Sequence, residues 1–163
     1  MDKSPITPNG LQKIKDELHY LKTVERATIS KAIEIARGHG DLSENADYDA
    51  AKQAQGMCEA KIRDLEARVS LAQVIDPATL SGDRVMFGVT VKFLDTDQDK
   101  EKVVVIVGES ESDIAKSYIS FSSPLARSLI GKRVGDFVEA SLPGGVREIE
   151  ILSVAYKPIE IEA

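Results

Sequence analysis

Four carboxylates gather in one short segment of the chain, HGDLSENADYDAAK, residues 39–52. Asp41, Glu44, Asp47 and Asp49 are close enough in sequence to repel one another. Such a cluster can form the solvated start of a helix, bind a metal ion or be presented to another molecule. Asp41 and Glu44 are three residues apart, a spacing that can point both side chains outward together in a loop or a first helical turn. The chemistry available here is that of paired oxygen ligands.

The plainest interpretation of the cluster is structural. A helix N-terminus favours nearby negative charge through its dipole and its free N–H groups. Either Ser43 or Asp41 could act as the N-cap. Asp47 and Asp49 are interpreted as solvated charges at the helix start. From the residues alone, this structural role is favoured over a functional one for the whole cluster.

Several kinds of self-contained active site are disfavoured. DLSENADYDAAK lacks the ligand order and central glycine of a calcium-binding loop. Two exposed carboxylates without a pocket cannot exclude water or shift a pKa as a hydrolase requires. They are also too few to hold Mg²⁺ firmly, because that ion keeps several waters and takes oxygens from other partners. The remaining option is that the pair completes a metal site of another protein, as in metal-assisted phosphodiester cleavage.

Two amphipathic stretches flank the cluster and must position it. Thr7 followed by Pro8 predicts an N-cap and a first helical residue. Apolar residues then recur at spacings of three and four, which predicts two helices of about 27 residues and about 40 Å each. The predicted seam of the first helix is Leu11, Ile14, Leu18, Leu21, Thr28, Ala32 and Ile35, with Glu25 as a charged interruption. The predicted seam of the second is Tyr48, Ala51, Gln55, Cys58, Ile62, Leu65, Val69 and Ala72.

Stripes of this width bury one another most simply in an antiparallel coiled-coil hairpin, with the acidic cluster at its turn. Ala32 and Ala51 would let the helices approach closely there and make a slim tip. From Ile75 onward the apolar period shortens to two, which predicts a small, mostly antiparallel sheet with one short helix. We therefore predict an α+β protein with a hairpin domain at 1–76 and a sheet domain at 77–163. The sheet domain is predicted from the strand segments VMFGVTVKFL and KVVVIV, from the helix SPLARSLIG, and from DFVEASL and REIEILSVAY on either side of the turn Pro143-Gly144-Gly145.

Composition narrows the class of protein further. Among 163 residues, 21 Lys and Arg against 27 Asp and Glu give a net charge of −6, so any contact with nucleic acid must be local or delegated to a partner. The single cysteine, Cys58, excludes an intrachain disulfide and is expected to be a small buried residue of the seam. MDKSPITPNG has no apolar core like that of a signal peptide, and no apolar run approaches the roughly 20 residues of a membrane span. A cytoplasmic location is expected.

The stretches ARGHGDLSENADYDAAKQAQG, SPLARSLIGKRVGD and LPGG resemble those of the Gre-type bacterial transcript cleavage factors. The resemblance covers nearly the whole chain, and it favours the GreA branch because AAKQAQG carries a single lysine. It implies an N-terminal antiparallel coiled coil followed by an FKBP-like α+β domain. It also reverses the structural interpretation of the cluster, because Asp41 and Glu44 match the family's functional carboxylates.

The resemblance implies an activity that is exerted through a partner. The hairpin enters the secondary channel of bacterial RNA polymerase, where Asp41 and Glu44 help to bind a catalytic Mg²⁺ and to position water. The polymerase then cleaves the 3′ end of backtracked nascent RNA, so the factor, expected to be a monomer, is not itself the enzyme. Asn45 and Asp47 are assigned to loop geometry or secondary contacts.

Further site residues are implied by position in the motifs. Arg37 and Lys52 match a basic patch that contacts the RNA 3′ segment, although the sequence alone favours an ordinary exposed helix charge at each position. Ser123 and Pro124 lie in the segment that docks on the polymerase, and simple helix capping explains them as well. His39, which has no triad partner nearby, is assigned a structural role in the loop.

Two rival functions stay open. A same-fold inhibitor would enter the polymerase channel and block it, but the intact Asp41 and Glu44 favour cleavage. A peptidyl-prolyl isomerase or chaperone-like module would use the sheet domain. With no Trp, four Phe and four Tyr, an aromatic-lined isomerase pocket is hard to assemble.

Overall fold

The computed structural model describes residues 3–41, 45–157 and 159, and the chain divides into two compact units. The helical unit contains residues 12–71. The sheet unit joins residues 1–11 to residues 72–163. The predicted domain limits of 1–76 and 77–163 stay a prediction. Within the described residues, no helix is long and apolar enough to cross a bilayer.

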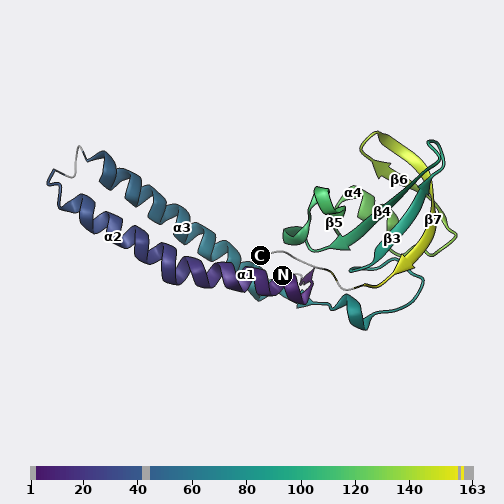
Figure 1. The fold of residues 1–163 in the computed structure, drawn as a ribbon, viewed down its shortest axis with the longest axis horizontal. Helices are drawn as coiled ribbons and strands as arrows, with labels where there is room; N and C mark the ends of the chain where they lie inside the picture. The colour runs from purple at the N-terminus through teal and green to yellow at the C-terminus, as the bar shows by residue number, and fades with distance from the viewer. Residues whose placement is uncertain (1–2, 42–44, 158, 160–163) are drawn as a thin grey trace. The chain divides into compact units, whose positions relative to one another are not determined.

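Two helical arms lie side by side in the helical unit (Figure 1). The first arm consists of α1 (Pro8–Tyr20), a π-helical turn η1 (Leu21–Glu25) and α2 (Arg26–Arg37). The second arm is the single helix α3 (Ala46–Leu71), which packs against α2. The predicted antiparallel hairpin is therefore confirmed.

The predicted seam of the first arm is wrong beyond η1. Thr28 and Ala32 are exposed, and Ile35 is 56% exposed. The residues of α2 that are buried lie one position further along the chain: Ile29, Ile33 and Ala36.

The π-helical turn explains this displacement. The Arg26 N–H donates its hydrogen bond to the Leu21 carbonyl, five residues back, so this turn holds one residue more than an α-helical turn. Buried Ile14 and Leu21 are seven residues apart, Leu21 and Ile29 are eight apart, and Ile29 and Ala36 are again seven apart. The extra residue advances the seam by one position, and nothing in the apolar spacing predicted it.

The seam of α3 agrees with its prediction. Ala51, Cys58, Ile62 and Leu65 are buried. The predicted positions Tyr48, Gln55 and Val69 are half-buried. The prediction is wrong at Ala72, because α3 ends at Leu71 and Ala72 begins a strand. The small residues that lie in the seam near the turn are Ala51 and Ala36, instead of the predicted pair Ala51 and Ala32.

The sheet unit contains a curled five-stranded sheet in the order β5-β4-β3-β7-β6, whose pairs are antiparallel except for the parallel pair β4–β5 (Figure 1). The predicted α+β class and the predicted short helix are confirmed. The β6–β7 hairpin closes at Pro143-Gly144, as predicted, with Gly145 at φ +124° where a side chain would be strained. The elements are β3 (Thr90–Asp95), β4 (Lys100–Val107), β5 (Tyr118–Ser120), α4 (Pro124–Leu129), β6 (Phe137–Leu142) and β7 (Gly145–Ala155), with short 3₁₀ turns at Pro77–Thr79, Glu109–Glu111 and Ile114–Lys116.

One face of the sheet carries the core of this unit. Strand alternation points every second side chain inward, and α4 contributes two buried residues. The buried cluster comprises Val85, Val89, Val91, Phe93, Val104, Ile106, Ala126, Leu129, Val138, Ala140, Leu142, Ile149 and Ile151.

The first residues of the chain are part of the sheet unit. Strand β1 (Ser4–Ile6) pairs in parallel with β2 (Ala72–Val74). Thr7 caps α1 as predicted, because its hydroxyl accepts from the Gly10 N–H at 3.0 Å. The buried Glu111 carboxylate accepts from both the N–H and the hydroxyl of Thr7. This carboxylate therefore fixes the start of α1.

Candidate functional site at the hairpin turn

The first arm ends in a tight turn that needs glycine. The N–H of Gly38 reaches the carbonyls of the last turn of α2, and the His39 N–H donates to the Ala36 carbonyl at 3.1 Å. Gly40 follows at φ +103°, a left-handed conformation that L side chains rarely adopt. The chain therefore leaves α2 immediately after Arg37.

Asn45 begins the second arm. Its side-chain oxygen accepts from the Tyr48 N–H at 3.0 Å, and its carbonyl accepts from the Asp49 N–H at 3.1 Å. This geometry makes Asn45 the N-cap of α3, so the predicted cap at Ser43 or Asp41 is wrong. The helix begins at Ala46, which leaves Asp41 four residues before the cap.

The same asparagine contacts the first arm. Its Nδ2 donates to the Ala36 carbonyl at 2.6 Å, and the Asn45 residue is only 8% exposed. One side chain thus bonds to the last turn of α2 and to the first turn of α3. From the sequence, Asn45 was expected to serve loop geometry or secondary contacts. The signal that could have identified its capping role is an Asn immediately before the apolar run of the second helix.

An open hollow lies at this turn, lined by His39, Asp41, Asn45, Ala46 and Asp47. Asp41 is exposed there, and the exposed side chains of His39 and Asp47 approach to 3.6 Å between Nδ1 and Oδ2. The pairing with Asp47 fits the structural role predicted for His39. Asp47 and Asp49 are exposed in the first turn of α3, as predicted.

The predicted RNA-contacting residues lie on opposite arms. Arg37 is exposed in the last turn of α2. Lys52 is exposed on α3, where its Nζ donates to Gln55 Oε1 at 2.9 Å. Glu44, the second predicted catalytic carboxylate, lies outside the described residues.

The donors that the structure describes at the turn can be compared with the ligands that Mg²⁺ needs. No group of three or more His, Cys, Asp or Glu side chains with metal-binding geometry occurs in the part of the chain that the structure describes. Asp41 offers carboxylate oxygens, the ligands that Mg²⁺ prefers, at an exposed position that another molecule can reach. The residues present therefore fit an Mg²⁺ ion whose other ligands come from elsewhere.

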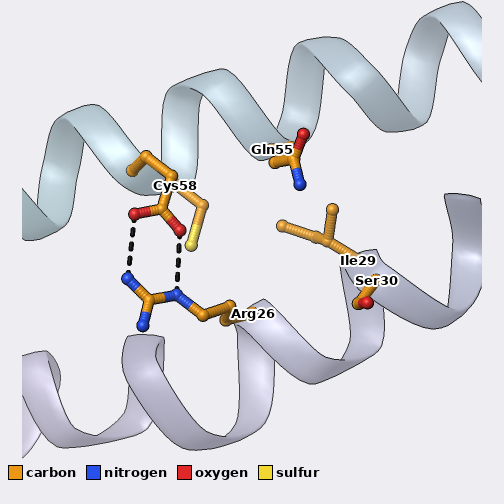
Figure 2. A pocket seen from close by; sticks show the side chains of 6 residues that line it. Arg26, Ile29, Ser30, Gln55 and Cys58 are labelled. Atoms are coloured by element: carbon orange, nitrogen blue, oxygen red, sulfur yellow. Dashed lines mark hydrogen bonds and ion pairs between the residues drawn. The ribbon is translucent and has the colours of Figure 1, made fainter.

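A second hollow lies between α2 and α3 (Figure 2). Arg26 forms a two-pronged ion pair with Glu59, with both N···O distances at 2.8 Å, and Cys58 lies beside this pair. Burial, followed by the neighbouring Glu25 and Glu59 charges, raises the pKa of the Cys58 thiol. The hydrogen bond from Arg26 holds the pKa of Glu59 below its usual range. Cys58 is therefore a buried thiol of low reactivity, as predicted.

The predicted docking residues cap a helix. The Ser123 hydroxyl accepts from the Ala126 N–H at 3.3 Å, and Pro124 is the first residue of α4. Both features are those of an ordinary helix start. Pro124 is exposed and Ser123 is half-buried.

Comparison with known proteins gives matches along most of the chain. Residues 4–74 match the family described as "Transcription elongation factor, N-terminal", and residues 80–156 match "Transcription elongation factor, GreA/GreB, C-term". The "Transcription elongation factor GreA" of Jannaschia sp. (strain CCS1) is 53% identical over 156 residues, 96% of this chain and 99% of that protein. Its namesake from Brucella anthropi is 51% identical over the same shares. The crystal structure of GreA factor homolog 1 (Gfh1) of Thermus thermophilus aligns with 93% of this chain and 98% of that one, at 25% identity and a TM-score of 0.43.

Proposed function

This chain belongs to the GreA/GreB family of transcription elongation factors, and from that premise we propose that it rescues backtracked, arrested bacterial RNA polymerase. In this proposal the hairpin enters the secondary channel of the polymerase. Its turn then meets the displaced 3′ end of the nascent RNA. The polymerase cleaves that RNA and regains a terminus that it can extend.

The observation that carries the proposal is the position of the carboxylate Asp41. It lies exposed at the turn of a slim two-helix hairpin, beside an open hollow and four residues before the cap of α3. A carboxylate presented in this way has no enclosing pocket of its own, so it can act on a reaction only inside a cleft that a partner provides. Glu44 follows within the same connection.

Asp41 and Glu44 would hold Mg²⁺ jointly with the polymerase, because two carboxylates supply too few ligands alone. Mg²⁺ held there would supply activation of a water molecule and neutralisation of charge on the phosphodiester. Arg37 and Lys52, one on each arm, would contact phosphates of the RNA end. Ser123 and Pro124 would contribute to docking of the sheet unit on the polymerase.

Addition of the protein to a stalled, backtracked elongation complex tests the proposal. We expect short RNA fragments from the 3′ end, followed by resumed elongation. The protein alone, free of polymerase, should bind Mg²⁺ weakly and leave RNA intact. Slower elongation without fragments would support the inhibitor instead, and prolyl isomerisation without any effect on the polymerase would support the isomerase.

A further inference from the structure

We propose that Asn45 is a positioning residue for the cleavage reaction, because it clamps the two arms at the base of the turn and so holds Asp41 in place. This inference rests on the proposed function. It concerns a residue that touches neither RNA nor metal and acts through the carboxylate that does.

Both ends of the Asn45 amide are used. Its oxygen accepts from the Tyr48 N–H at 3.0 Å, and its nitrogen donates to the Ala36 carbonyl at 2.6 Å. The opposite orientation of the amide would face oxygen to carbonyl oxygen and nitrogen to N–H, so only one orientation satisfies both partners. At 8% exposure the side chain is largely shielded from water, which would otherwise compete for these bonds.

Capping alone does not require asparagine at this position. Ser, Thr and Asp cap helices about as well, because the cap needs only an oxygen acceptor. The bond to Ala36 needs a hydrogen-bond donor as well, which an ionised Asp lacks and which Ser and Thr offer only as one O–H on a shorter side chain. A serine side chain is too short to bridge both arms. The identity of residue 45 therefore serves the link between the arms as well as the start of α3.

The clamp closes the segment that carries Asp41. The Ala36 carbonyl accepts from the His39 N–H and from the Asn45 side chain. Ala36 and Asn45 are nine residues apart in sequence, and this shared acceptor joins the end of α2 to the start of α3. Asp41 lines the same hollow as His39 and Asn45. Among the described residues, the other polar contact between the two ends of this segment is the exposed pair of His39 and Asp47 at 3.6 Å, whereas the Asn45 bond is shielded from water. A shift of about 1 Å in a reacting group can cost about a hundredfold in rate.

Two variants separate clamping from capping. Asn45→Ser keeps an N-cap oxygen and loses the bond to Ala36, whereas Asn45→Ala loses both. Three quantities are measured for each variant: the maximal cleavage rate at saturating factor and Mg²⁺, the half-saturating factor concentration for polymerase binding, and the midpoint of thermal unfolding. We expect both variants to lose about 10- to 100-fold in maximal rate. The binding constant should stay within about twofold of wild type, and only Asn45→Ala should unfold at a clearly lower temperature.

The opposite pattern overturns the inference. If Asn45→Ser cleaves at the wild-type rate and only Asn45→Ala is impaired, residue 45 is merely a cap. If both variants reach the wild-type cleavage rate at saturating factor, residue 45 affects only binding to the polymerase. Wild-type protein in the same assay reports on the proposed function. If wild-type protein releases no fragments, both the proposed function and this inference are overturned. If wild type and Asn45→Ser cleave equally well, only the positioning role of Asn45 is overturned.

Discussion

Carboxylates occupy two opposite environments in this chain, and the environment decides what each one does. Asp41 is exposed at the turn, where it lines an open hollow. Asp95 and Glu111 are buried, and each accepts three or more hydrogen bonds from neighbouring donors. A buried carboxylate surrounded by donors stabilises the fold, because it satisfies N–H and O–H groups that water cannot reach.

The two proposed metal ligands, Asp41 and Glu44, are tested by replacing each carboxylate with an amide of the same size. We expect Asp41→Asn or Glu44→Gln to reduce polymerase-dependent RNA cleavage by a hundredfold or more, because loss of an anionic metal ligand costs about 3 kcal/mol or more of transition-state stabilisation. Binding to the polymerase, measured by competition with wild type, should survive. Asp49→Asn is the matched control, because Asp49 is exposed in the first turn of α3. Full cleavage by the double variant would assign the turn to helix capping alone.

The buried Asp95 predicts a dependence of stability on pH. Burial opposes its ionisation, but the hydrogen bond from Arg147 and those from the Gln98 and Asp97 N–H groups outweigh burial, so its pKa lies below its usual range. The pKa of Asp95 in the folded protein is below its unfolded value of about 3.9. Ionised Asp95 therefore stabilises the fold fully above that value, and this stabilisation is lost as the pH falls through the folded pKa. We expect Asp95→Asn to be less stable at pH 7 and to lose less further stability below pH 4. Denaturant unfolding of the sheet unit across this pH range measures both effects, and equal pH profiles for the two proteins would contradict the assignment.

The packing around Glu111 is tested at Gly10, with Gly56 as the control in an open position. A Cβ at Gly10 would lie 2.7 Å from Glu111 Cγ, and the Glu111 side chain cannot move aside because its hydrogen bonds to Thr7 and Gly108 hold it. Gly10→Ala should therefore cost about 1–3 kcal/mol in the free energy of unfolding. At Gly56, within α3, a Cβ would meet nothing within 4 Å, so Gly56→Ala should gain about 0.5–1 kcal/mol. Denaturant unfolding measures both, and a Gly10→Ala protein as stable as wild type would show that Glu111 is free to move.

At the scale of elements, the π-helical turn sets the register of the hairpin. It adds one residue between Leu21 and Ile29, which are eight apart where α-helical packing has seven. The residues before and after η1 thereby share one buried stripe, although their sequence spacing is out of phase by one position. Sequence periodicity alone places Thr28 and Ala32 in that stripe, whereas the turn places them in solvent.

Deleting one exposed residue tests this role of the turn. Removal of Thr23, within η1, should convert the turn to regular α-helix and keep Leu21 and Ile29 on one face, so the free energy of unfolding should change by only about 1 kcal/mol. Removal of the exposed Lys31, within regular α2, should rotate Ile33 and Ala36 by about 100° out of the stripe and destabilise the hairpin severely. Thermal unfolding followed by circular dichroism compares the two. If both deletions lower the unfolding temperature equally, the π-helical turn does not accommodate the loss of a residue better than regular α2 does.

At the scale of the whole molecule, the chain consists of a helical unit and a sheet unit that each have their own buried residues. The sheet unit includes the first strand of the chain, through the pairing of β1 with β2 and the bond of Thr7 to Glu111. The link between β2 and the main sheet contains exposed residues at 80–84, with Gly82 at φ +123°. This link is the natural place for a protease to enter.

Limited proteolysis tests the predicted boundary between residues 74 and 82. A protease that cuts beside apolar residues should cleave first near Leu80 and release a stable fragment that continues to the end of the sheet unit. Fragment masses and N-terminal sequencing identify the cut. If no stable fragment ever begins in this region, the division at 76/77 is wrong.

Local patterns in the sequence were enough to predict the helical hairpin, the seam of α3, strands β3, β4, β6 and β7, the capped helix α4 and the Pro143-Gly144 turn. Each depends on residues within a few positions of one another, where period, capping chemistry and turn residues act directly. The family motif around residues 39–52 likewise led to the proposal that Asp41 and Glu44 are the carboxylates that act in RNA cleavage.

Only the tertiary structure decided the register of α2, the cap at Asn45 and the anchor at Glu111. The π-helical turn has no signature in apolar spacing, because it is selected by the fit of one arm against the other. Asn45 meets Ala36, and Glu111 meets Thr7, across nine and 104 residues of sequence. Such contacts form only where folding brings separate donors and acceptors together away from water, and so the pattern of either segment alone does not reveal them.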